Sequence, residues 1–583
     1  METKNKGYLL HTDKEVKTLV GNVPLNQYPR FNLVRNSYIC LNGLWQYKIT
    51  KDKGFAGDFD ENIMVPFVVE SPLSMVSHLL EPDEYIFYKK QIDVPSDLKN
   101  NKLILHFDGI DQNADIFIDG DLVGSTSLPY CVNALDITKF VDKKNSFTLV
   151  VRVQDVTDDS YFCRGKQQLK PNYWFYSSSS GVYKQVWMEV VPQNNIIKVV
   201  FAGDFDKKRV SVEVFTDEVT DAQIIINGHI FNVKTLQNVT LDLINDFHPW
   251  TIDSPYLYHV QIKTDCDQVT SYFGIKKIEV QNDKILLNNK EFFINGLLYQ
   301  GYYYLGGLTP KTYSEYEFDV KKTKELGYNC LRVHMTVEDD YFYYLCDKYG
   351  ILVIQDIPCG GEKYRVPIHV YPTLNAKIFN HECFCTKKWH GRKNIEGQKD
   401  FYLNAYRIID DHRNFPSIFM YTIFNESWGQ FDASLLYTKL KEVDSTRLFD
   451  TTSGWLKAKL TDVYSVHSYS FYWKNRQDKK THKPFILTEF GGASLKVENH
   501  FYYSIVYGHG VVQDNKELSM VYKKQYTRII ELMTKGHLKG CIYTQFNDCE
   551  TECNGIYTLD RSVLKIDENL IKELNNKINN LNK

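Results

Sequence analysis

Two glutamates lie at the ends of apolar segments and are the residues of this sequence best suited to chemistry. Glu426 follows the run Ile-Phe-Met-Tyr-Thr-Ile-Phe-Asn, and Glu489 follows Phe-Ile-Leu-Thr. A buried strand that ends on a carboxylate is what a parallel barrel presents at its catalytic mouth. Two carboxylates that face one another are the minimal equipment for breaking a glycosidic bond. The sequence therefore predicts chemistry on a sugar at these two positions.

A retaining glycosidase needs two carboxyl groups about 5–5.5 Å apart, one to attack the sugar and one to protonate the leaving oxygen. We assign Glu489 as the nucleophile, because Gly491 and Gly492 behind it leave space for the substrate. We assign Glu426 as the acid/base, with a pKa raised by enclosure and by the neighbouring carboxylate. One glutamate at a strand end is more often a solvated loop residue or a helix cap, but two such glutamates favour function.

The segments that must position these glutamates begin near residue 281, where strands alternate with helices and indicate a parallel sheet. Eight strands are predicted, at 292–299, 330–334, 351–356, 417–426, 448–453, 463–469, 485–489 and 540–545. Helices are predicted at 314–326, 341–348, 433–443, 518–534 and 568–578. Eight strands, mostly linked by helices, in about 300 residues match a (β/α)8 TIM barrel. A doubly wound open sheet is the alternative, but it would leave the number eight unexplained.

The ends of the predicted strands supply a ring of polar and aromatic side chains. Because a barrel carries its active site at the carboxyl ends of its strands, these residues are candidate contacts to a sugar. They are His334, Asp356, Asn425, Trp428, Trp455, His467, Tyr469 and Gln545. Asn425 is placed to bond the sugar 2-hydroxyl, and Trp428 and Trp455 can stack on the sugar ring. Glu426 ends the fourth strand and Glu489 the seventh, so their carboxylates should converge over the barrel axis.

The first 280 residues are expected to form two β-sandwiches. Residues 1–192 contain short alternating runs, such as Leu-Ile-Leu-His-Phe at 103–107, that are separated by turn pairs such as Asp-Gly at 108–109. Residues 193–280 continue this pattern over a length that suits an immunoglobulin-like sandwich.

The composition limits the class of protein. A chain of 583 residues is too long for one core and should form about three or four domains. The net charge of −3 gives no electrostatic reason to expect a nucleic acid or an anionic membrane as partner. The 41 Tyr and 8 Trp would suit stacking on sugars, but β-rich structure and low genomic GC content explain them more simply.

The N-terminal residues and the cysteines favour a cytoplasmic protein. Residues 1–6 lead into no apolar segment, and no run approaches the length of a membrane span. The 12 cysteines are scattered without the spacing of a disulfide framework.

Several other features favour structural roles. One is a group of cysteines and histidines whose spacing is not that of a tetrahedral zinc site, so that a structural metal is a minor alternative. Its members are His381, Cys383, Cys385 and His390. Residues 410–413 should end a helix, and 339–340 should cap the start of one. Arg332 either orients Glu489 or is a buried structural arginine. The segment 360–399 lacks periodicity and is expected to be a loop insertion near the barrel mouth.

With these residues in place, the sequence resembles glycoside hydrolase family 2, the family of β-galactosidases, β-glucuronidases and β-mannosidases, and most closely its compact β-galactosidase-like members. In the barrel the resemblance rests on Asn-Cys-Leu-Arg-Val-His at 329–334, Asn-Glu at 425–426 and Glu-Phe-Gly-Gly at 489–492. Upstream it rests on Arg-Gly-Lys-Gln at 164–167 and Ser-Gly-Val-Tyr at 180–183. It implies a sugar-binding jelly-roll domain (1–192), an immunoglobulin-like domain (193–280) and a catalytic barrel (281–583). It also implies retaining hydrolysis through a glycosyl-enzyme intermediate.

The resemblance favours a terminal β-D-galactoside as the substrate. Family β-glucuronidases grip the uronate with an Asn-x-Lys-Gly motif, where this chain has Glu-Cys-Asn-Gly at 552–555. No lysine stands there to neutralise a carboxylate, and Glu552 would repel it. The continuation Asn-Gly-Ile-Tyr-Thr at 554–558 is shared with β-galactosidase-like members. A histidine expected after the first strand is Gln300 or Tyr302 here, which leaves other sugars open.

The resemblance implies no redox cofactor. Some family β-galactosidases hold magnesium with a Glu and a His after the third strand, but this chain has Gln355 and Asp356, so that ligand motif is not matched. We expect a small glycoside or oligosaccharide as partner, and the self-association common in the family allows a homo-oligomer. Two alternatives stay open: the same mechanism on a β-mannoside, α-L-arabinoside or β-glucuronide, and a catalytically silent sugar-binding protein.

Overall fold

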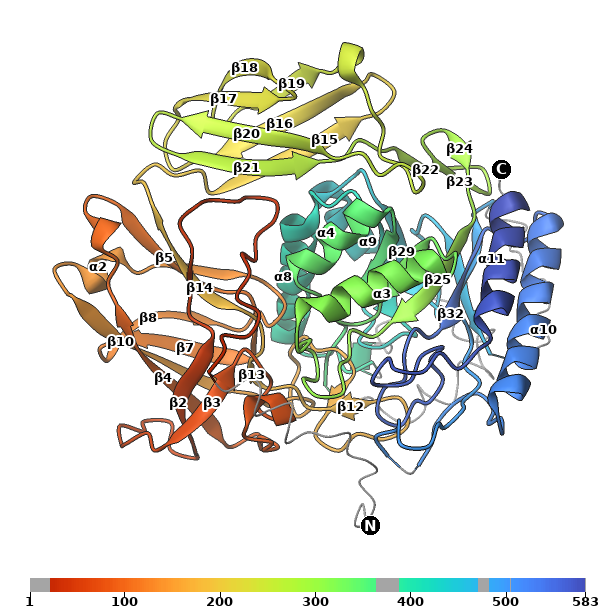
Figure 1. The fold of residues 1–583 in the computed structure, drawn as a ribbon, viewed down its shortest axis with the longest axis horizontal. Coiled ribbons are helices and arrows are strands. Elements are labelled where there is room, and N and C mark those ends of the chain that lie inside the picture. Colours follow the sequence, from red (N-terminus) through yellow and green to blue (C-terminus); the bar gives the residue numbers. More distant parts are fainter. Residues whose placement is uncertain (1–20, 363–386, 389, 470–481, 504, 582–583) are drawn as a thin grey trace.

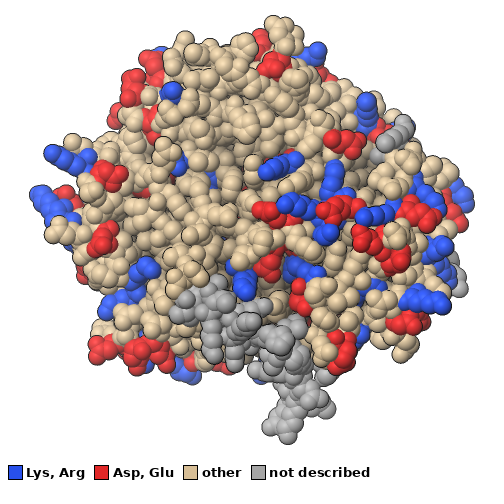
Figure 2. Space-filling model, in the orientation of Figure 1, with Lys and Arg blue, Asp and Glu red and all other residues tan. Residues whose placement is uncertain are grey.

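In the computed structural model the chain forms two β-sandwiches and a parallel barrel surrounded by helices (Figure 1). The structure describes residues 21–362, 387–388, 390–469, 482–503 and 505–581. None of the helices in this part of the chain is both long and apolar enough to cross a membrane. Acidic and basic side chains are intermixed along the right-hand part of the face shown in Figure 2.

The N-terminal sandwich consists of two antiparallel sheets. Strand β10 (Ser146–Gln154) shows the alternation expected from the sequence, because it buries Phe147, Leu149, Val151 and Val153 and leaves the residues between them partly exposed. One sheet has the order β1 (Ile39–Cys40), β14 (Val186–Val191), β5 (Lys102–Phe107), β9 (Asn133–Asp136). The other has the order β3 (Glu61–Val65), β2 (Gly43–Thr50), β4 (Tyr85–Asp93), β10, β7 (Asn113–Ile118), β8 (Asp121–Thr126). Shorter elements are β6 (Ile110–Asp111), α2 (Thr138–Val141), β11 (Gln167–Gln168), β12 (Tyr176–Ser177) and β13 (Gly181–Val182).

The second sandwich covers one end of the barrel (top of Figure 1). Its first sheet has the order β15 (Lys198–Asp204), β16 (Arg209–Phe215), β19 (Asn238–Asp242). Its second has the order β18 (His229–Lys234), β17 (Asp221–Ile226), β20 (Tyr258–Thr264), β21 (Gln268–Phe273). A small sheet of β22 (Ile278–Gln281), β23 (Lys284–Leu287) and β24 (Lys290–Glu291) leads into the barrel. Two hydrogen bonds to Asp347 attach this sandwich to the barrel. The Tyr272 hydroxyl donates to the Asp347 carboxylate at 2.8 Å, and the Trp250 ring N–H donates to the Asp347 carbonyl oxygen at 2.8 Å.

The barrel has the eight parallel strands that the sequence predicts, so the TIM-barrel prediction is confirmed. They are β25 (Ile294–Tyr299), β26 (Cys330–Val333), β27 (Leu352–Asp356), β28 (Ile418–Asn425), β29 (Leu448–Ser453), β30 (Tyr464–Ser468), β31 (Phe485–Gly491) and β32 (Gly540–Thr544). Seven neighbouring pairs are joined by backbone ladders, but β29 and β30 are not. There the hydroxyl of Ser465 donates to Asp450 at 2.8 Å and Ser453 lies 3.0 Å from the His467 ring, so side chains close the barrel.

Within the part of the chain that the structure describes, six longer helices accompany these strands, and for one of them, α8, the sequence predicts only the end. The helices are α3 (Tyr313–Glu325), α4 (Asp340–Tyr349), α8 (Ile395–His412), α9 (Ala433–Val443), α10 (Asn515–Thr534) and α11 (Glu568–Leu581). Helix α8 begins inside the segment expected to be a loop, and residues 410–413 lie at its end as expected. Residues 363–386 and 389 of that segment lie outside the described residues. Asp339 occupies the N-cap position of α4, as expected, but its side chain makes no capping hydrogen bond, and its carboxylate lies 3.7 Å from Lys184 Nζ.

The N-terminal sandwich is fixed to the barrel mouth by backbone contacts around Gly165. Two glycines in the loop after β27 make these contacts. The Gly360 N–H donates to the Arg164 carbonyl oxygen at 2.9 Å, and the Gly361 N–H donates to the Phe162 carbonyl oxygen at 3.2 Å. A Cβ atom on Gly165 would lie 2.3 Å from the backbone oxygen of Met335, so only glycine permits this close approach. The contact brings the adjacent β11 and β12 segments against the carboxyl ends of the barrel strands.

We expect Gly165→Ala to loosen this contact. Because the added methyl group overlaps barrel backbone, the substitution should destabilise the protein by about 1–3 kcal/mol, as overpacking does. Thermal unfolding measures the effect, and Gly54→Ala in an exposed loop of the same sandwich is the control, since its Cβ would meet only Asp52 at 3.5 Å. Equal unfolding temperatures for the two variants would contradict the described contact.

Candidate functional site

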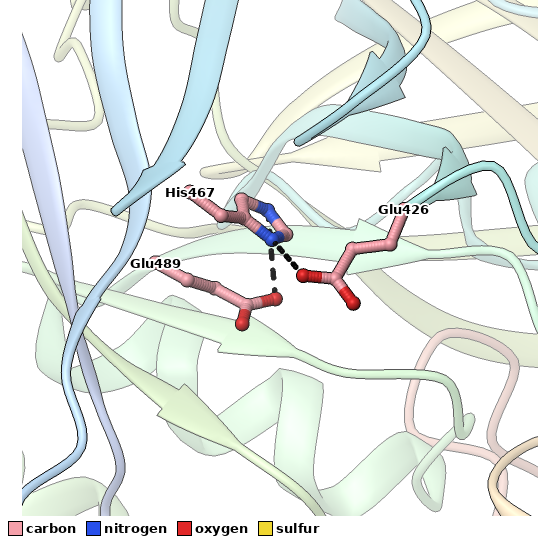
Figure 3. A group of neighbouring side chains, drawn as sticks. All are labelled: Glu426, His467 and Glu489. Carbon is pink, nitrogen blue, oxygen red and sulfur yellow. Dashed lines mark hydrogen bonds and ion pairs between the residues drawn. The ribbon is translucent and has the colours of Figure 1, made fainter. Parts of the chain in front are cut away.

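The two glutamates expected to do chemistry lie close together at the barrel mouth (Figure 3). Glu426 directly follows β28, and Glu489 lies within β31. The ring of His467, from β30, stands between them: Nδ1 is 2.7 Å from Glu426 Oε1, and Nε2 is 3.5 Å from Glu489 Oε1. An oxygen of each carboxyl group and a nitrogen of this ring all lie within 4.8 Å of one another. The carboxyl separation is therefore compatible with attack by one group and proton transfer by the other.

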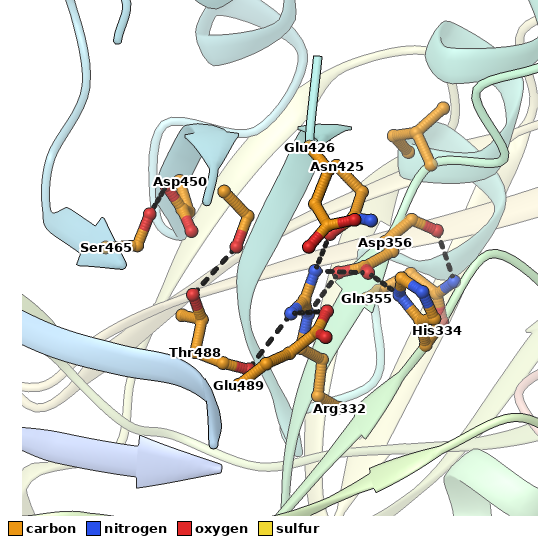
Figure 4. Close-up of polar contacts among 12 residues, drawn as sticks. Arg332, His334, Gln355, Asp356, Asn425, Glu426, Asp450, Ser465, Thr488 and Glu489 are labelled. Carbon is orange, nitrogen blue, oxygen red and sulfur yellow. Dashed lines mark hydrogen bonds and ion pairs between the residues drawn. The ribbon is translucent and has the colours of Figure 1, made fainter. Parts of the chain in front are cut away.

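Arg332 joins the strand ends into one network (Figure 4). Its fully buried guanidinium donates to Asp356 at 3.1 Å, to Glu489 at 2.9 Å and to the side-chain oxygen of Asn425 at 2.8 Å. Burial alone would raise the pKa of Asp356, but the charges of Arg332 and His334 outweigh it and lower that pKa. The cation thus fixes an acid on β27, an amide on β28 and a second acid on β31, which lies across the barrel from the other two.

Glu426 occupies an unusual backbone conformation. Its φ is +46°, in the left-handed region that disfavours residues with a Cβ atom. The side chain retains 17% exposure, and burial raises its pKa, while nearby cations such as Lys166 and Arg332 oppose that rise. A carboxyl group with a raised pKa keeps its proton to higher pH, as a general acid must.

His467 contacts the two carboxylates rather than open space. It was predicted to bind substrate, but its side chain is fully buried, and both nitrogens already face protein atoms. Burial lowers its pKa to about 3, so the ring is neutral. The carboxylate of Glu426 accepts from Nδ1–H, which leaves Nε2 as an acceptor next to Arg332 Nη1, 3.4 Å away. Its position therefore suits orientation of Glu426.

Two of the predicted aromatic residues and His334 border the same network. The hydroxyl of Tyr469 donates to Glu489 Oε2, and its ring stacks on His509 at 3.4 Å between centroids. Trp455 meets the His467 ring edge-on at 5.8 Å. His334 Nδ1 lies 2.7 Å from Asp356 Oδ2, which orients its ring.

The remaining predicted residues lie against the N-terminal sandwich or deeper in the barrel. The ring of Trp428 packs on Phe175 of the sandwich at 5.4 Å. Gln545 is fully buried and accepts from Gln300 Nε2 at 2.7 Å, while its own amide donates to Asn554 at 2.7 Å. Gln545 therefore connects the ends of the first and eighth strands.

Gly491 serves packing rather than substrate access. Its φ is +96°, and a Cβ atom there would lie 2.4 Å from the Tyr543 ring. The space that the sequence suggested for substrate is thus filled on this side by an aromatic side chain.

Sequence reasoning missed several residues near the site. Lys166 and Tyr176 come from the sandwich, more than 300 positions before the loop that holds their partner Glu552. Nothing in the local sequence signals that contact. His509 lies between two glycines in a loop without periodicity, and only its stacking on Tyr469 marks it.

The residues after the third strand do not fit a magnesium site. The amide of Gln355 donates to Thr336 and Asp356 carbonyl oxygens at 2.7 and 2.8 Å, and its oxygen accepts from Tyr343 at 2.6 Å. The carboxylate of Asp356 is already bound to Arg332 and His334. Hard cations require free oxygen ligands, which this arrangement does not offer. Of the four residues in the cysteine and histidine group, only His390 lies in the described part, where its ring faces the carbonyl of Gln430 at 3.1 Å.

A (β/α)8 barrel preceded by sandwiches, with carboxylates at its mouth, has the architecture of a glycosyl hydrolase. The chain belongs to glycoside hydrolase family 2, since the family profile for the TIM barrel domain matches residues 278–579. The galactose-binding domain-like profile of the same family matches residues 78–180.

Relatives carry two different activities in their names. A β-galactosidase of Thermoanaerobacter pseudethanolicus is 25% identical over 75% of this chain, and the match spans only 58% of that protein's length. A β-glucuronidase of Streptococcus agalactiae is 22% identical over 80% of this chain and 84% of its own. The solved structure of a β-D-glucuronidase from Dictyoglomus thermophilum has a TM-score of 0.74 at 18% identity, covering 94% of this chain and 98% of that one. This last likeness shows the shared fold.

The poor fit of these residues to magnesium can be tested by removing metal ions. We expect dialysis against EDTA to leave the rate of aryl glycoside hydrolysis unchanged, because no step depends on the residues after the third strand holding a cation. Metal analysis of the dialysed protein is the accompanying check. A loss of activity that added MgCl2 restores would contradict the fit described here.

Proposed function

We propose that this protein is a retaining exo-β-glycosidase that removes a terminal non-reducing β-D-galactosyl group. The observation that carries the proposal is the approach of the Glu426 and Glu489 carboxyl oxygens to within 4.8 Å. Retaining enzymes hold their carboxyl groups about 5–5.5 Å apart, whereas inverting enzymes need about 6.5–9.5 Å to admit a water molecule.

Glu489 is the proposed nucleophile. Arg332 donates to Oε1 at 2.9 Å, and the Tyr469 hydroxyl donates to Oε2, so both oxygens are oriented and their negative charge is stabilised. A carboxylate oxygen attacks the anomeric carbon as the bond to the leaving oxygen breaks, and an ester between the sugar and Glu489 forms.

Glu426 is the proposed acid/base. In the first step it gives its proton to the leaving oxygen, and in the second it takes a proton from the water that attacks the anomeric carbon and releases Glu489. The His467 contact of 2.7 Å holds the Glu426 carboxyl group in place through both steps. We therefore assign His467 to positioning rather than to substrate contact.

The sugar would be held by groups around these carboxylates. The side-chain oxygen of Asn425 accepts a hydrogen bond from Arg332, which leaves the NH2 group of Asn425 to donate to the substrate. The sugar 2-hydroxyl is the proposed partner of that NH2 group. Trp455 and Trp428 supply aromatic surface for the apolar side of the ring. His334 is held by Asp356 through Nδ1, and its Nε2, which has no hydrogen-bond partner among the described residues, is the proposed contact to a sugar hydroxyl.

A β-glucuronide is the second candidate substrate. It is favoured by the β-glucuronidase relative that this chain matches over 84% of that protein's length. A silent sugar-binding protein is less well supported, because it would have no use for paired carboxylates that an arginine and a tyrosine orient.

Removal of either carboxylate should separate their roles. We expect Glu489→Ala to lower kcat by on the order of 10⁶-fold, as loss of a nucleophile does. Glu426→Ala should lower kcat by about 10²–10⁴-fold for phenyl galactoside, and much less for a dinitrophenyl leaving group that needs no proton. Azide should restore turnover of Glu426→Ala by giving a β-galactosyl azide. Glu442→Ala, an exposed position on α9, is the control. Full activity in either active-site variant would refute the assignment.

The raised pKa of Glu426 predicts the pH dependence. Hydrolysis requires Glu426 protonated, so kcat/KM should fall on the alkaline side at a pH above that expected for an ordinary glutamate. Lys166→Met removes a charge that holds this pKa down, so the alkaline limb should move to higher pH. The measurement is the pH profile of kcat/KM for phenyl galactoside. A limb that stays in place or moves to lower pH would contradict this electrostatic account.

A further inference from the structure

We propose that a row of aromatic side chains at the rim of the barrel mouth is a second subsite, which binds a sugar as the leaving group of the glycoside. The aromatic row consists of Tyr173 and Trp174 from the N-terminal sandwich and of Tyr507 and His509 from the loop between β31 and α10. The inference rests on the proposed function, because it names the part of the substrate that lies beyond the bond to be broken.

The four rings form a continuous row that reaches the proposed nucleophile. The ring centroid of Tyr507 lies 5.8 Å from that of Tyr173 and 5.3 Å from that of Trp174. It also lies 5.9 Å from that of His509, whose ring stacks on Tyr469. The Tyr469 hydroxyl in turn donates to the nucleophile carboxylate. Because Tyr173 is 60% exposed, the aromatic row leads from the carboxylates to solvent.

Hydrogen bonds of the backbone hold the loop that carries half of this row. The N–H of Tyr507 donates to the carbonyl oxygen of Thr551 at 2.8 Å, and the N–H of His509 donates to that of Gly492 at 2.8 Å. The Thr551 hydroxyl donates to the carbonyl oxygen of Tyr173, so the loop after β32 joins the two halves of the row. A surface that is ordered before a ligand arrives loses less conformational freedom on binding, as a subsite requires.

The aromatic row lies on the side of the site where the leaving group must be. Phe175, beside the row, packs its ring on Trp428 at 5.4 Å, and Trp428 follows Glu426 by two positions. The negative charge of Glu426 also acts on the side chains of Tyr507 and His509. Because the acid protonates the leaving oxygen, the group attached to that oxygen lies next to Glu426 and would meet the row.

The chemistry of the row suits a sugar better than a flat hydrocarbon. Aromatic faces offer large and rigid apolar surface, on which the apolar side of a pyranose can stack. The Tyr507 hydroxyl and the ring nitrogens of His509 have no hydrogen-bond partner among the described residues. Sugar hydroxyls can bond to these polar atoms while the ring stacks, whereas an unsubstituted aromatic group cannot. We therefore assign a pyranose as the occupant.

The test compares kcat/KM for two galactosides that differ only in the leaving group. The leaving sugar of 4-O-β-D-galactosyl-D-glucose can reach the row, whereas the leaving group of methyl β-D-galactoside is too small. We expect Tyr507→Ala to lower the disaccharide-to-methyl ratio by about 5–30-fold, as loss of an aromatic anchor does. Tyr406→Ala, which removes a tyrosine that is 38% exposed on α8, is the matched control and should leave the ratio unchanged.

Two further substitutions of Tyr507 separate stacking from packing. Tyr507→Phe keeps the aromatic face and should retain most of the ratio. Tyr507→Leu keeps apolar packing without that face, so it should lose the ratio as Tyr507→Ala does. Thermal unfolding verifies that each variant is folded. An unchanged ratio in Tyr507→Ala or Tyr507→Leu, an equal loss in Tyr507→Phe, or the same loss in the control would each overturn the inference.

A binding measurement distinguishes this inference from the proposed function. Calorimetric titration with methyl β-D-glucopyranoside, which carries the leaving-group ring without a galactosyl group, should show weaker binding to Tyr507→Ala than to the wild type. This difference does not depend on whether any glycoside is hydrolysed. If no galactoside is turned over but the difference appears, the proposed function fails and the subsite stands. Equal affinity of the two proteins for this probe would overturn the subsite, even with full galactosidase activity.

Discussion

One buried guanidinium holds the chemistry of this barrel in place. Arg332 is fully enclosed, and its hydrogen bonds reach the ends of the third, fourth and seventh strands. Taking a cation out of water is expensive unless its donors are satisfied, and here two carboxylates and an amide oxygen satisfy them. The same contacts that stabilise the cation orient the proposed nucleophile, so the stability of the barrel mouth and its function depend on the same atoms.

The N-terminal sandwich contributes to the site because its backbone comes very close to the barrel. Because Gly165 has no side chain, the sandwich backbone can touch the barrel there. Lys166 and Tyr176 of the sandwich then reach Glu552 of the barrel domain. The loop after β32 then links them to Gln545 and the first strand. The site is therefore a property of the assembled chain, and the isolated barrel would lack one of its walls.

The strands and helices that show clear hydrophobic periodicity could be predicted from the local sequence. The uninterrupted apolar run of β28 predicts a strand buried on both faces, and the carboxylate that follows it marks the barrel mouth. The seventh strand was predicted to end at Glu489, but it continues for two residues to Gly491, so Glu489 lies within the strand. The end of helix α8 was expected at residues 410–413, but its start was missed because the segment before it shows no periodicity.

Contacts that join distant segments could not be predicted. The strand-end position of His467 suggested a sugar ligand, but its partners Glu426 and Ser453 arrive from other strands and enclose it. The sequence around Glu552 suggested an unpaired negative charge, because the lysine that pairs with it lies in another domain.

The backbone at Glu426 has an evolutionary consequence. A left-handed residue with a full side chain costs roughly 1 kcal/mol or more relative to glycine, and Ser427 beside it has a φ of +67°. Glycine or asparagine at this position would relieve the backbone strain, so if Glu426 is the acid/base of the proposed mechanism, selection for catalysis would have to maintain it. A descendant released from that selection should lose this carboxylate early and still retain a well-folded barrel.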